Sequence, residues 1–343
     1  MRTVIAIPPM PRMTGGIAVL YQMAGRLREC GYEVALAGAA EAPGFAEQAA
    51  RGFTLLPWET LAPRRGSGAL RPDDVLVAAE GWPNMTAPAL AAKSRVLVYA
   101  QNWAYVFSAL PEGISWHTLP VSFLAVSQPV AHFVEAMAKL PLAGIVRPSI
   151  DTALFRPGPA KTSRLVRIAW MPRKNKALAE QIRRIAEAME QGRGASRAEW
   201  VEIRNMPPPE VARTLGACHI FLATGFPEGC PLPPLEAMAS GCLVVGFSGF
   251  GGWDYMRQAE GGRYSPRLEP RVVPWGGNGL FAADGDVIEA SILLDRAVSL
   301  VREQDQGCAA IREEALRTAA AYSIDAQREE VRVLWDKLAG EAR

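Results

Sequence analysis

Short apolar runs alternate with amphipathic segments along nearly the whole chain, and this alternation restricts the fold more than any other feature. The runs in the first half are TVIAIP, YEVALAG, DVLVAA, RVLVYA and FLAVS, and those in the second half are LVRIAWM, EWVEIR, HIFLAT, CLVVGF and GLFAA. Such runs are typical of strands that are covered on both faces of a parallel sheet. The segments between them, such as residues 16–30 and 176–192, have the periodicity of helices. The sequence therefore predicts an α/β protein with two doubly wound, Rossmann-like parallel sheets.

The length of the chain, 343 residues, favours two domains over one hydrophobic core. Three prolines interrupt the segment VRPSIDTALFRPGPAKTSR, which contains no core-like run, so we expect the boundary there. The expected N-terminal domain spans residues 1–152, and the expected C-terminal domain spans residues 160–320. A C-terminal helix, residues 324–343, has apolar positions at helical spacing and is expected to complete the N-terminal domain. Ligands of such folds bind at the carboxyl ends of the strands, in a cleft that both domains face.

Composition restricts the class of protein. The formal net charge is only +2, which argues against a nucleic-acid-binding surface. No apolar run reaches the roughly 18 residues that span a bilayer, and the N-terminal run is too short for a signal sequence. We therefore expect a cytoplasmic protein without a transmembrane segment, either free or in peripheral contact with the inner face of the membrane. An odd number of cysteines without paired spacing indicates reduced thiols, and three histidines make a zinc site improbable.

The segment EGCPLPPLEAMASGCLVVGFSGFGG places Glu228 and Glu236 eight positions apart around a pair of prolines. Pro233 and Pro234 suit the first turn of a helix, and Gly241 is a natural residue at its end. Glu228 is then expected in a loop and Glu236 in the first helical turn. The amides of a helix start favour a phosphate, and a carboxylate can accept hydrogen bonds from ribose hydroxyls. Alternatively, Glu236 only stabilises the helix start and Glu228 is a solvated loop charge.

This segment resembles the glutamate-x7-glutamate signature of glycosyltransferase family 4, the retaining nucleotide-sugar transferases of the two-Rossmann GT-B fold. In the family's order, TGGIAVLYQMAGRLRECGYEVALAG is similar to its N-terminal glycine loop and first helix, FLAVSQPVAHF to its last N-domain strand, and SIDTALFRP to its interdomain link. The resemblance implies that Glu236 binds the donor ribose and that Glu228 contacts hydroxyls of the transferred sugar. It further implies backbone contacts to that sugar from Gly229, Cys230, Pro231 and Leu232. Phenylalanine-glycine is common in the family where this chain has Cys230-Pro231, and Pro231 has no N–H, so one expected amide contact is absent.

Positive charge for a diphosphate is expected in WMPRKNKALAEQI, where Arg173, Lys174 and Lys176 cluster at the start of a helix. Lys176 matches the family's lysine in this loop, whereas Arg173 lies closer to it than the family's arginine does. Gly15 and Gly16 are expected to let the N-domain backbone approach the phosphates or the acceptor. The alternatives are a solvated charged turn and a plain backbone turn. Prolines follow the first strand where a nicotinamide enzyme has G-x-G-x-x-G, which argues against such an enzyme.

The acceptor is expected against AQNWAYVFSALPEGISWHT, whose aromatic faces can stack on a sugar or a lipid-linked chain. The candidate residues are Asn102, Trp103, Tyr105 and His117. The alternative is a loop that is anchored by buried aromatic side chains. Asp284–Asp286 resembles the metal-binding D-x-D of another transferase fold, but Asp286 is better explained as a helix cap.

These features predict a metal-independent, retaining glycosyltransferase of the EC 2.4 class, with a role in polysaccharide biosynthesis. It would use a nucleotide-sugar donor and a carbohydrate, lipid-linked or small-molecule acceptor, without a further cofactor. Glu228, Arg173 and Lys176 are the catalytic candidates. A nucleotide-sugar epimerase of the same fold and an inactive nucleotide-sugar-binding protein remain alternatives. A glycosidase is disfavoured, since it needs one protonated carboxyl whereas the helix dipole at Glu236 favours ionisation.

Overall fold

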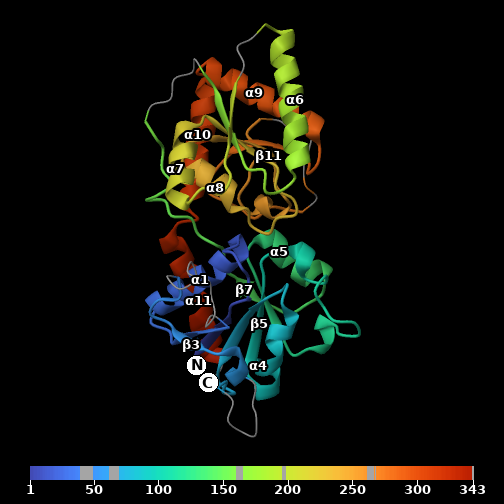
Figure 1. Cartoon of the computed structure of the whole chain (residues 1–343), viewed down its shortest axis with the longest axis vertical. Helices are drawn as coiled ribbons and strands as arrows, with labels where there is room; N and C mark the ends of the chain where they lie inside the picture. Colours follow the sequence, from blue (N-terminus) through green and yellow to red (C-terminus); the bar gives the residue numbers. More distant parts are fainter. Residues whose placement is uncertain are drawn as a thin grey trace. The chain divides into compact units, whose positions relative to one another are not determined.

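The computed structural model describes residues 1–38, 49–61, 69–159, 165–194, 198–260, 266 and 268–341. The chain divides into two compact units, one of Met1–Pro148 with Asp325–Arg343 and one of Ser149–Ile324. Each unit has one parallel sheet with helices on both faces, which confirms the predicted fold class (Figure 1). The division falls before residue 152 because Ile150 donates its N–H to the Tyr322 carbonyl, at 2.9 Å, within the second unit. No helix in the described ranges is long and apolar enough to span a membrane.

The first unit contains a seven-stranded sheet. Its order is β3 (Thr54–Leu56), β2 (Val34–Ala37), β1 (Thr3–Ala6), β4 (Val75–Ala79), β5 (Arg95–Ala100), β6 (Ser122–Ala125) and β7 (Leu142–Ile145). The described helices are α1 (Gly15–Glu29), α3 (Trp58–Leu61), α4 (Ala87–Ala92), α5 (Gln128–His132) and α11 (Ile324–Glu341), with the short turns η2 (Pro83–Thr86), η3 (Trp103–Tyr105), η4 (Trp116–Thr118) and η5 (Phe133–Met137). The five predicted strands are present. The sequence analysis missed the edge strands β3 and β7, which are short and only partly buried.

Helix α11 packs on the first unit although it comes from the other end of the chain. Figure 1 shows it beside the N-terminal segments, close to both termini. The Trp335 side chain is fully buried, and its Nε1 donates to the Thr3 hydroxyl of β1 at 2.9 Å. Arg147 donates from its backbone N and from Nη1 to the Glu330 carboxylate at 2.9 and 2.7 Å. The core of the first unit therefore depends on residues from both ends of the sequence.

The second unit contains a five-stranded parallel sheet. Its order is β12 (Gly279–Ala282), β11 (Leu243–Phe247), β10 (Ile220–Ala223), β8 (Arg167–Trp170) and β9 (Glu199–Glu202). Its helices are α6 (Lys176–Gly192), α7 (Pro208–Ala217), α8 (Leu232–Ala239), α9 (Val287–Arg302) and α10 (Gln306–Ala320), with the short turn η6 (Gly251–Asp254). Successive strand residues point to opposite faces. Ile168 and Leu222 pack with α6 and α9, whereas Ala169 and Phe221 pack with α7 and α8.

Strand order reverses once in each sheet. In the second unit the chain runs from β8 outward to β9 and then returns to β10 on the other side of β8. In the first unit the same reversal occurs between β1 and β4. Open parallel sheets bind ligands outside the carboxyl ends of the strands at such a switch point. The loops that follow β8 and β10 are therefore the first place to look for a site in the second unit.

Replacing the buried indole that joins α11 to β1 should destabilise the first unit. We expect Trp335→Ala to lower its free energy of unfolding by about 3–5 kcal/mol, because a large cavity and an unpaired Thr3 hydroxyl remain. Urea unfolding followed by circular dichroism measures the loss. Val333→Ala on the same helix is the matched control, since Val333 is 55% exposed and should change stability by less than about 0.5 kcal/mol. Equal effects of the two substitutions would contradict the packing described above.

Candidate functional site

The loops that follow β8 and β10 are joined by side chains at the switch point of the second sheet. Lys174 Nζ lies 2.8 Å from Glu228 Oε2 in an ion pair whose side chains are 25% and 18% exposed. The neighbouring residue, Asn175, donates from Nδ2 to the carbonyls of Thr224 at 2.9 Å and Phe226 at 3.1 Å. Two consecutive side chains of one loop thus fix the other loop and orient the carboxylate that it carries.

A pocket opens at this junction. Its lining residues are Met171, Arg173, Lys174, Phe221, Leu222, Ala223, Thr224, Gly225, Glu228, Pro231, Pro233, Pro234 and Phe247. The lining combines one carboxylate and two cations with an apolar wall of proline and aromatic rings. The exposed guanidinium of Arg173 has no ion-pair or hydrogen-bond partner within the described ranges. It is therefore available to an anion that enters the pocket.

Lys176 was expected to supply positive charge here, but it does not line the pocket. It is the first residue of α6, and its Nζ lies 3.4 Å from Glu180 Oε1 one turn further along the helix. Asn175, at the helix N-cap, has a left-handed backbone with φ of 55°, and this turn separates the two lysines. Lys174 is therefore the lysine that lines the pocket. The sequence contained it in the same cluster, but only the pairing of the two loops distinguishes it from Lys176.

The glycine-rich loop after β11, residues 248–252, holds the backbone of Glu228 in place. Glu228 N donates to the Gly249 carbonyl at 2.9 Å, and Gly251 N donates to the Glu228 carbonyl at 3.1 Å. A Cβ atom at Gly249 would lie 2.7 Å from the Glu228 Cβ, and one at Gly251 would lie 2.0 Å from the Gly229 carbonyl oxygen. Only glycine fits at these two positions. The loop is a support for the Glu228 segment.

The two acids of the DGD sequence have contacts within the protein. Asp284 Oδ1 accepts from the N–H of Gly249 at 2.8 Å and so anchors the glycine-rich loop. Asp286 Oδ1 accepts from the N–H of Glu289 at 3.0 Å, which confirms that it caps α9. In the described part of the chain, no three His, Cys, Asp or Glu side chains are grouped so that they could share a metal ion. All five cysteines are free thiols.

The start of α8 offers fewer amide donors than the sequence suggested. Pro231 is the N-cap residue, and no side chain caps this end of the helix. Pro233 and Pro234 follow Leu232 in the first turn. Since proline has no N–H, Leu232 alone among these four positions can donate a backbone hydrogen bond. Gly229 and Cys230, which precede Pro231, also have backbone N–H groups.

Glu236 lies just beyond the first turn of α8, in which it was expected. The helix begins at Leu232, so Glu236 is its fifth residue and not part of the first turn. Its partly buried carboxylate has no ion-pair or hydrogen-bond partner among the described residues. Burial raises its pKa to about 7. The expectation that the helix dipole keeps this group ionised is therefore wrong, because desolvation dominates beyond the first turn.

In the first unit, Gly15 and Gly16 form the first turn of α1, whose N-cap Thr14 accepts from Ile17 N through its hydroxyl. A Cβ atom at Gly16 would lie 2.4 Å from Gln101 Oε1, whereas one at Gly15 would meet nothing within 4 Å. Gly16 thus allows the helix start to pack against the end of β5. Gly15 instead borders open space at the start of α1.

A buried carboxylate that the sequence analysis missed supports the end of β5. Glu80 is 3% exposed and accepts from the backbone N–H groups of Gln101 at 3.1 Å and Asn102 at 2.8 Å. Burial raises its pKa to about 7. The Asn102 side chain caps η3 by accepting from Ala104 N at 3.1 Å. Asn102, a candidate for acceptor contact, therefore has a structural role in the described state.

The remaining acceptor candidates differ in how available they are. The Trp103 ring packs against Phe133 with centroids 6.1 Å apart. Both ring nitrogens of His117 have partners, the Ser115 hydroxyl at 3.2 Å and the Ala138 carbonyl at 2.9 Å. Tyr105 is 48% exposed. Among these candidates, Tyr105 and His117 are exposed, and Tyr105 offers an aromatic face for which no ring contact is found within the described residues.

Sequence comparison gives one short match, and no family model matches the chain. An alpha-1,6-glucosyltransferase of Actinobacillus pleuropneumoniae serotype 7 (strain AP76) is 43% identical over 51 residues. Those residues are 15% of this chain and 16% of that protein. The match thus covers about one sixth of the curated relative.

Solved structures resemble the chain over almost its full length. A sucrose-phosphate synthase from Thermosynechococcus elongatus has a TM-score of 0.64 at 11% identity and covers 99% of this chain and 100% of its own. The lipopolysaccharide outer core galactosyltransferase WaaB has a TM-score of 0.67 at 11% identity, with coverages of 98% and 99%. The pneumococcal O-GlcNAc transferase GtfA, solved with UDP and GlcNAc, has a TM-score of 0.63 at 10% identity, with both coverages 99%. The chain therefore has the GT-B fold.

The buried Glu236 carboxylate should make stability depend on pH. Because its pKa is about 7 in the folded protein and about 4.5 when unfolded, the folded state binds more protons between these values, and stability falls as pH rises through this window. We expect Glu236→Gln to be more stable than the wild type at pH 8 by about 1–3 kcal/mol, and equally stable at pH 4.5. Urea titrations of both proteins at the two pH values measure this difference. Glu228→Gln, which breaks an ion pair, should instead destabilise the protein at pH 8. A stability gain of Glu236→Gln that does not change with pH would contradict the assignment.

Proposed function

We propose that the chain transfers a sugar from a nucleotide-diphosphate sugar to a carbohydrate, lipid-linked or small-molecule acceptor. One observation carries this proposal: the Lys174–Glu228 pair and Arg173, which has no partner among the residues that the structure describes, line one pocket at the switch point of the second sheet. The two cations, Arg173 and Lys174, can bind a diphosphate. The oriented Glu228 carboxylate can accept hydrogen bonds from sugar hydroxyls. The GT-B fold and the short match to a glucosyltransferase support the same chemistry.

The proposed donor contacts follow from the availability of each group. Arg173 binds the diphosphate, and Lys174 adds a second positive charge while it orients Glu228. Glu228 accepts hydrogen bonds from hydroxyls of the transferred sugar, and Glu236 accepts them from the ribose. The amides of Gly229, Cys230 and Leu232 complete the contacts, whereas Pro231 contributes its ring to the wall. Lys176 has no part in this assignment because Glu180 pairs with it outside the pocket.

The proposed reaction retains the anomeric configuration. The bond from C1 to the diphosphate oxygen breaks while the acceptor oxygen bonds to C1, and the acceptor proton passes to the departing phosphate. Arg173 and Lys174 stabilise the charge that develops on the diphosphate. Among the described residues that line the pocket, Glu228 is the sole carboxylate, and its pairing with Lys174 favours an orienting role over a nucleophilic one.

We propose that the acceptor contacts the first unit. The exposed Tyr105 and Phe107 offer aromatic faces, and the space beside Gly15 lets a ligand approach the start of α1. The lipopolysaccharide galactosyltransferase among the similar structures supports a glycan or lipid-linked acceptor, and hence a role in polysaccharide biosynthesis. The second unit supplies the donor contacts.

An inactive nucleotide-sugar-binding protein is the second candidate, because one observation favours it. The prolines at 231, 233 and 234 remove backbone donors from the start of α8, where a transferring enzyme needs to stabilise developing charge. Such a protein would bind the donor and release no nucleotide in the presence of acceptors. Turnover therefore separates the two candidates, whereas binding does not.

Nucleotide binding is the first test of the proposed function. Calorimetry with UDP, GDP, ADP and NAD should find one nucleoside diphosphate that binds at micromolar affinity. At pH 8, where a pKa of about 7 leaves Glu236 mainly ionised, Glu236→Gln should weaken this binding by about 1–3 kcal/mol, the loss expected for hydrogen bonds to a charged group. Lys174→Met should weaken it roughly tenfold, while Lys176→Met serves as the matched control and should leave it unchanged. Best binding by NAD, or no binding at all, would overturn the proposal.

The stereochemical course and the metal requirement can be tested together. With the nucleotide sugar that matches the bound nucleotide, and alkyl glycosides as acceptors, we expect the product to keep the donor's anomeric configuration in NMR spectra. A chelator should change the rate less than about twofold, because Arg173 and Lys174 supply the positive charge that a metal ion would otherwise provide. An inverted product would exclude the retaining course. Loss of turnover in chelator that Mn²⁺ restores would exclude metal independence.

A further inference from the structure

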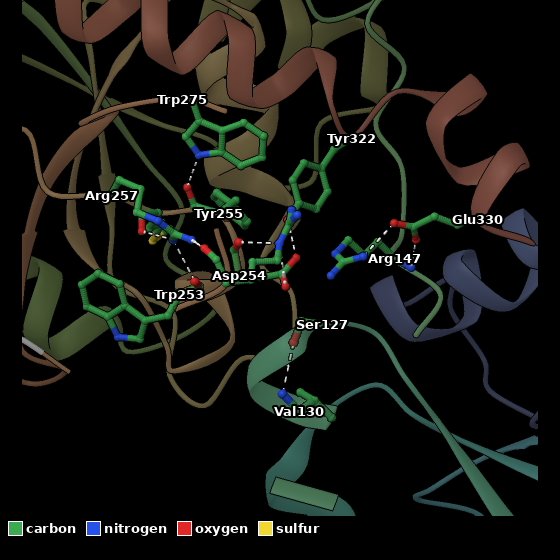
Figure 2. Close-up of polar contacts among 12 residues, drawn as sticks. Ser127, Val130, Arg147, Trp253, Asp254, Tyr255, Arg257, Trp275, Tyr322 and Glu330 are labelled. Atoms are coloured by element: carbon green, nitrogen blue, oxygen red, sulfur yellow. Dashed lines mark hydrogen bonds and ion pairs between the residues drawn. The ribbon is translucent and has the colours of Figure 1, made fainter. Parts of the chain in front are cut away.

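A carboxylate with no exposed surface lies beside the glycine-rich loop. Asp254, at the end of η6, is 0% exposed, and the Tyr322 hydroxyl donates to its Oδ2 (Figure 2). Arg271 Nε donates to the Asp254 carbonyl at 3.1 Å and lies 3.5 Å from its Oδ1. Arg271 Nη2 also donates to the Tyr322 hydroxyl at 3.1 Å. Burying ionic groups is costly, and apolar residues of similar volume often stabilise a core as well or better. A buried ionic network of this kind therefore suggests that its residues are needed to hold neighbouring parts of the chain in place.

The residue next to Asp254 extends this network toward the pocket. Tyr255 is fully buried, and its hydroxyl donates to the Pro231 carbonyl at 2.6 Å. The Tyr255 carbonyl accepts from Trp275 Nε1 at 2.9 Å and from Asn278 Nδ2 at 2.8 Å. Figure 2 shows Tyr255 between Asp254 and Trp275. Its backbone is thus fixed, and its buried hydroxyl contacts Pro231, which lines the pocket, although Tyr255 itself does not line it.

Pro231 is the point of the site where such support matters most. As the N-cap of α8 it has no side-chain cap and no N–H of its own. Its ring lines the pocket, and a Cβ atom at Gly252 would lie 3.4 Å from its Cγ. The same helix carries Glu236. A shift of Pro231 would therefore move both the pocket wall and the start of the helix that bears the proposed ribose-binding carboxylate.

We propose that Tyr255 is a positioning residue of the donor site, held in place by the buried Asp254–Tyr322–Arg271 network. Its hydrogen bond to the Pro231 carbonyl fixes the position of the residue at which α8 starts. This inference rests on the proposed function, because it takes the pocket as a nucleotide-sugar site. Its consequence is that a hydroxyl buried under the pocket determines donor affinity.

The chain supplies a matched control for this idea. Tyr99 in the first unit is also fully buried, and its hydroxyl also donates to a backbone carbonyl, that of Val146, at 2.6 Å. We expect Tyr255→Phe and Tyr99→Phe to lower the melting temperature by similar amounts. Only Tyr255→Phe should weaken binding of the nucleoside diphosphate in calorimetry, by roughly three- to tenfold, since one hydrogen bond is worth about that factor.

A second variant tests the network itself. Tyr322→Phe keeps the Tyr255 hydroxyl but removes the hydroxyl that donates to Asp254. It should therefore weaken binding less than Tyr255→Phe does. If the two tyrosines act through one contact, the double variant should bind no more weakly than Tyr255→Phe alone. Should Tyr255→Phe fail to fold, Tyr322→Phe against Tyr99→Phe provides the comparison.

The outcomes separate this inference from the proposed function. Wild-type affinity in Tyr255→Phe, or an equal loss in Tyr99→Phe, would overturn the positioning role while the wild type still binds its nucleotide. Failure of the wild type to bind UDP, GDP or ADP would overturn the proposed function, and this inference with it.

Discussion

The ion pair between Lys174 and Glu228 is the contact on which the candidate site depends. Parallel pairing of β8 with β10 places two loops at one edge of the sheet, and the ion pair converts their closeness into a fixed arrangement. Both side chains are mostly buried, so neither is fully solvated, and each compensates part of the desolvation cost of the other. The pocket, the exposed guanidinium of Arg173 and the glycine-rich loop that supports Glu228 all lie around this pair.

Stability and function oppose each other at the carboxylates of this protein. The pKa values of Glu236 and Glu80 are both raised to about 7 by burial, so at neutral pH the fold retains groups that it would be more stable without. Glu236 has no partner within the described residues, and under the proposed function the donor ribose would supply one. Glu80 differs, since two backbone amides already use its oxygens.

Much of the fold could be predicted because strands and helices leave local patterns. The periodicity of residues 176–192 predicted the bounds of α6, and the ten apolar runs are the ten main strands. The arrangement of the candidate site was harder to predict from the sequence. Choosing Lys174 over Lys176 requires the pairing of two loops that are distant in sequence, and the burial of Glu80 depends on neighbouring strands. Glu236 was placed in the first turn of α8, although it is the fifth residue, because a helix start can shift by a residue without changing the pattern.

The packing of α11 on β1 has a consequence for the order in which the protein is made. The second unit, residues 149–324, is continuous and is complete before the last helix leaves the ribosome. The first unit emerges earlier, but the indole of Trp335 that fills its core is synthesised 332 residues after its partner Thr3. Vectorial synthesis therefore produces residues 1–148 first, but their unit is completed only after the whole second unit has been synthesised. Until residues 324–341 have been synthesised, the first unit lacks the helix that buries Trp335 against β1.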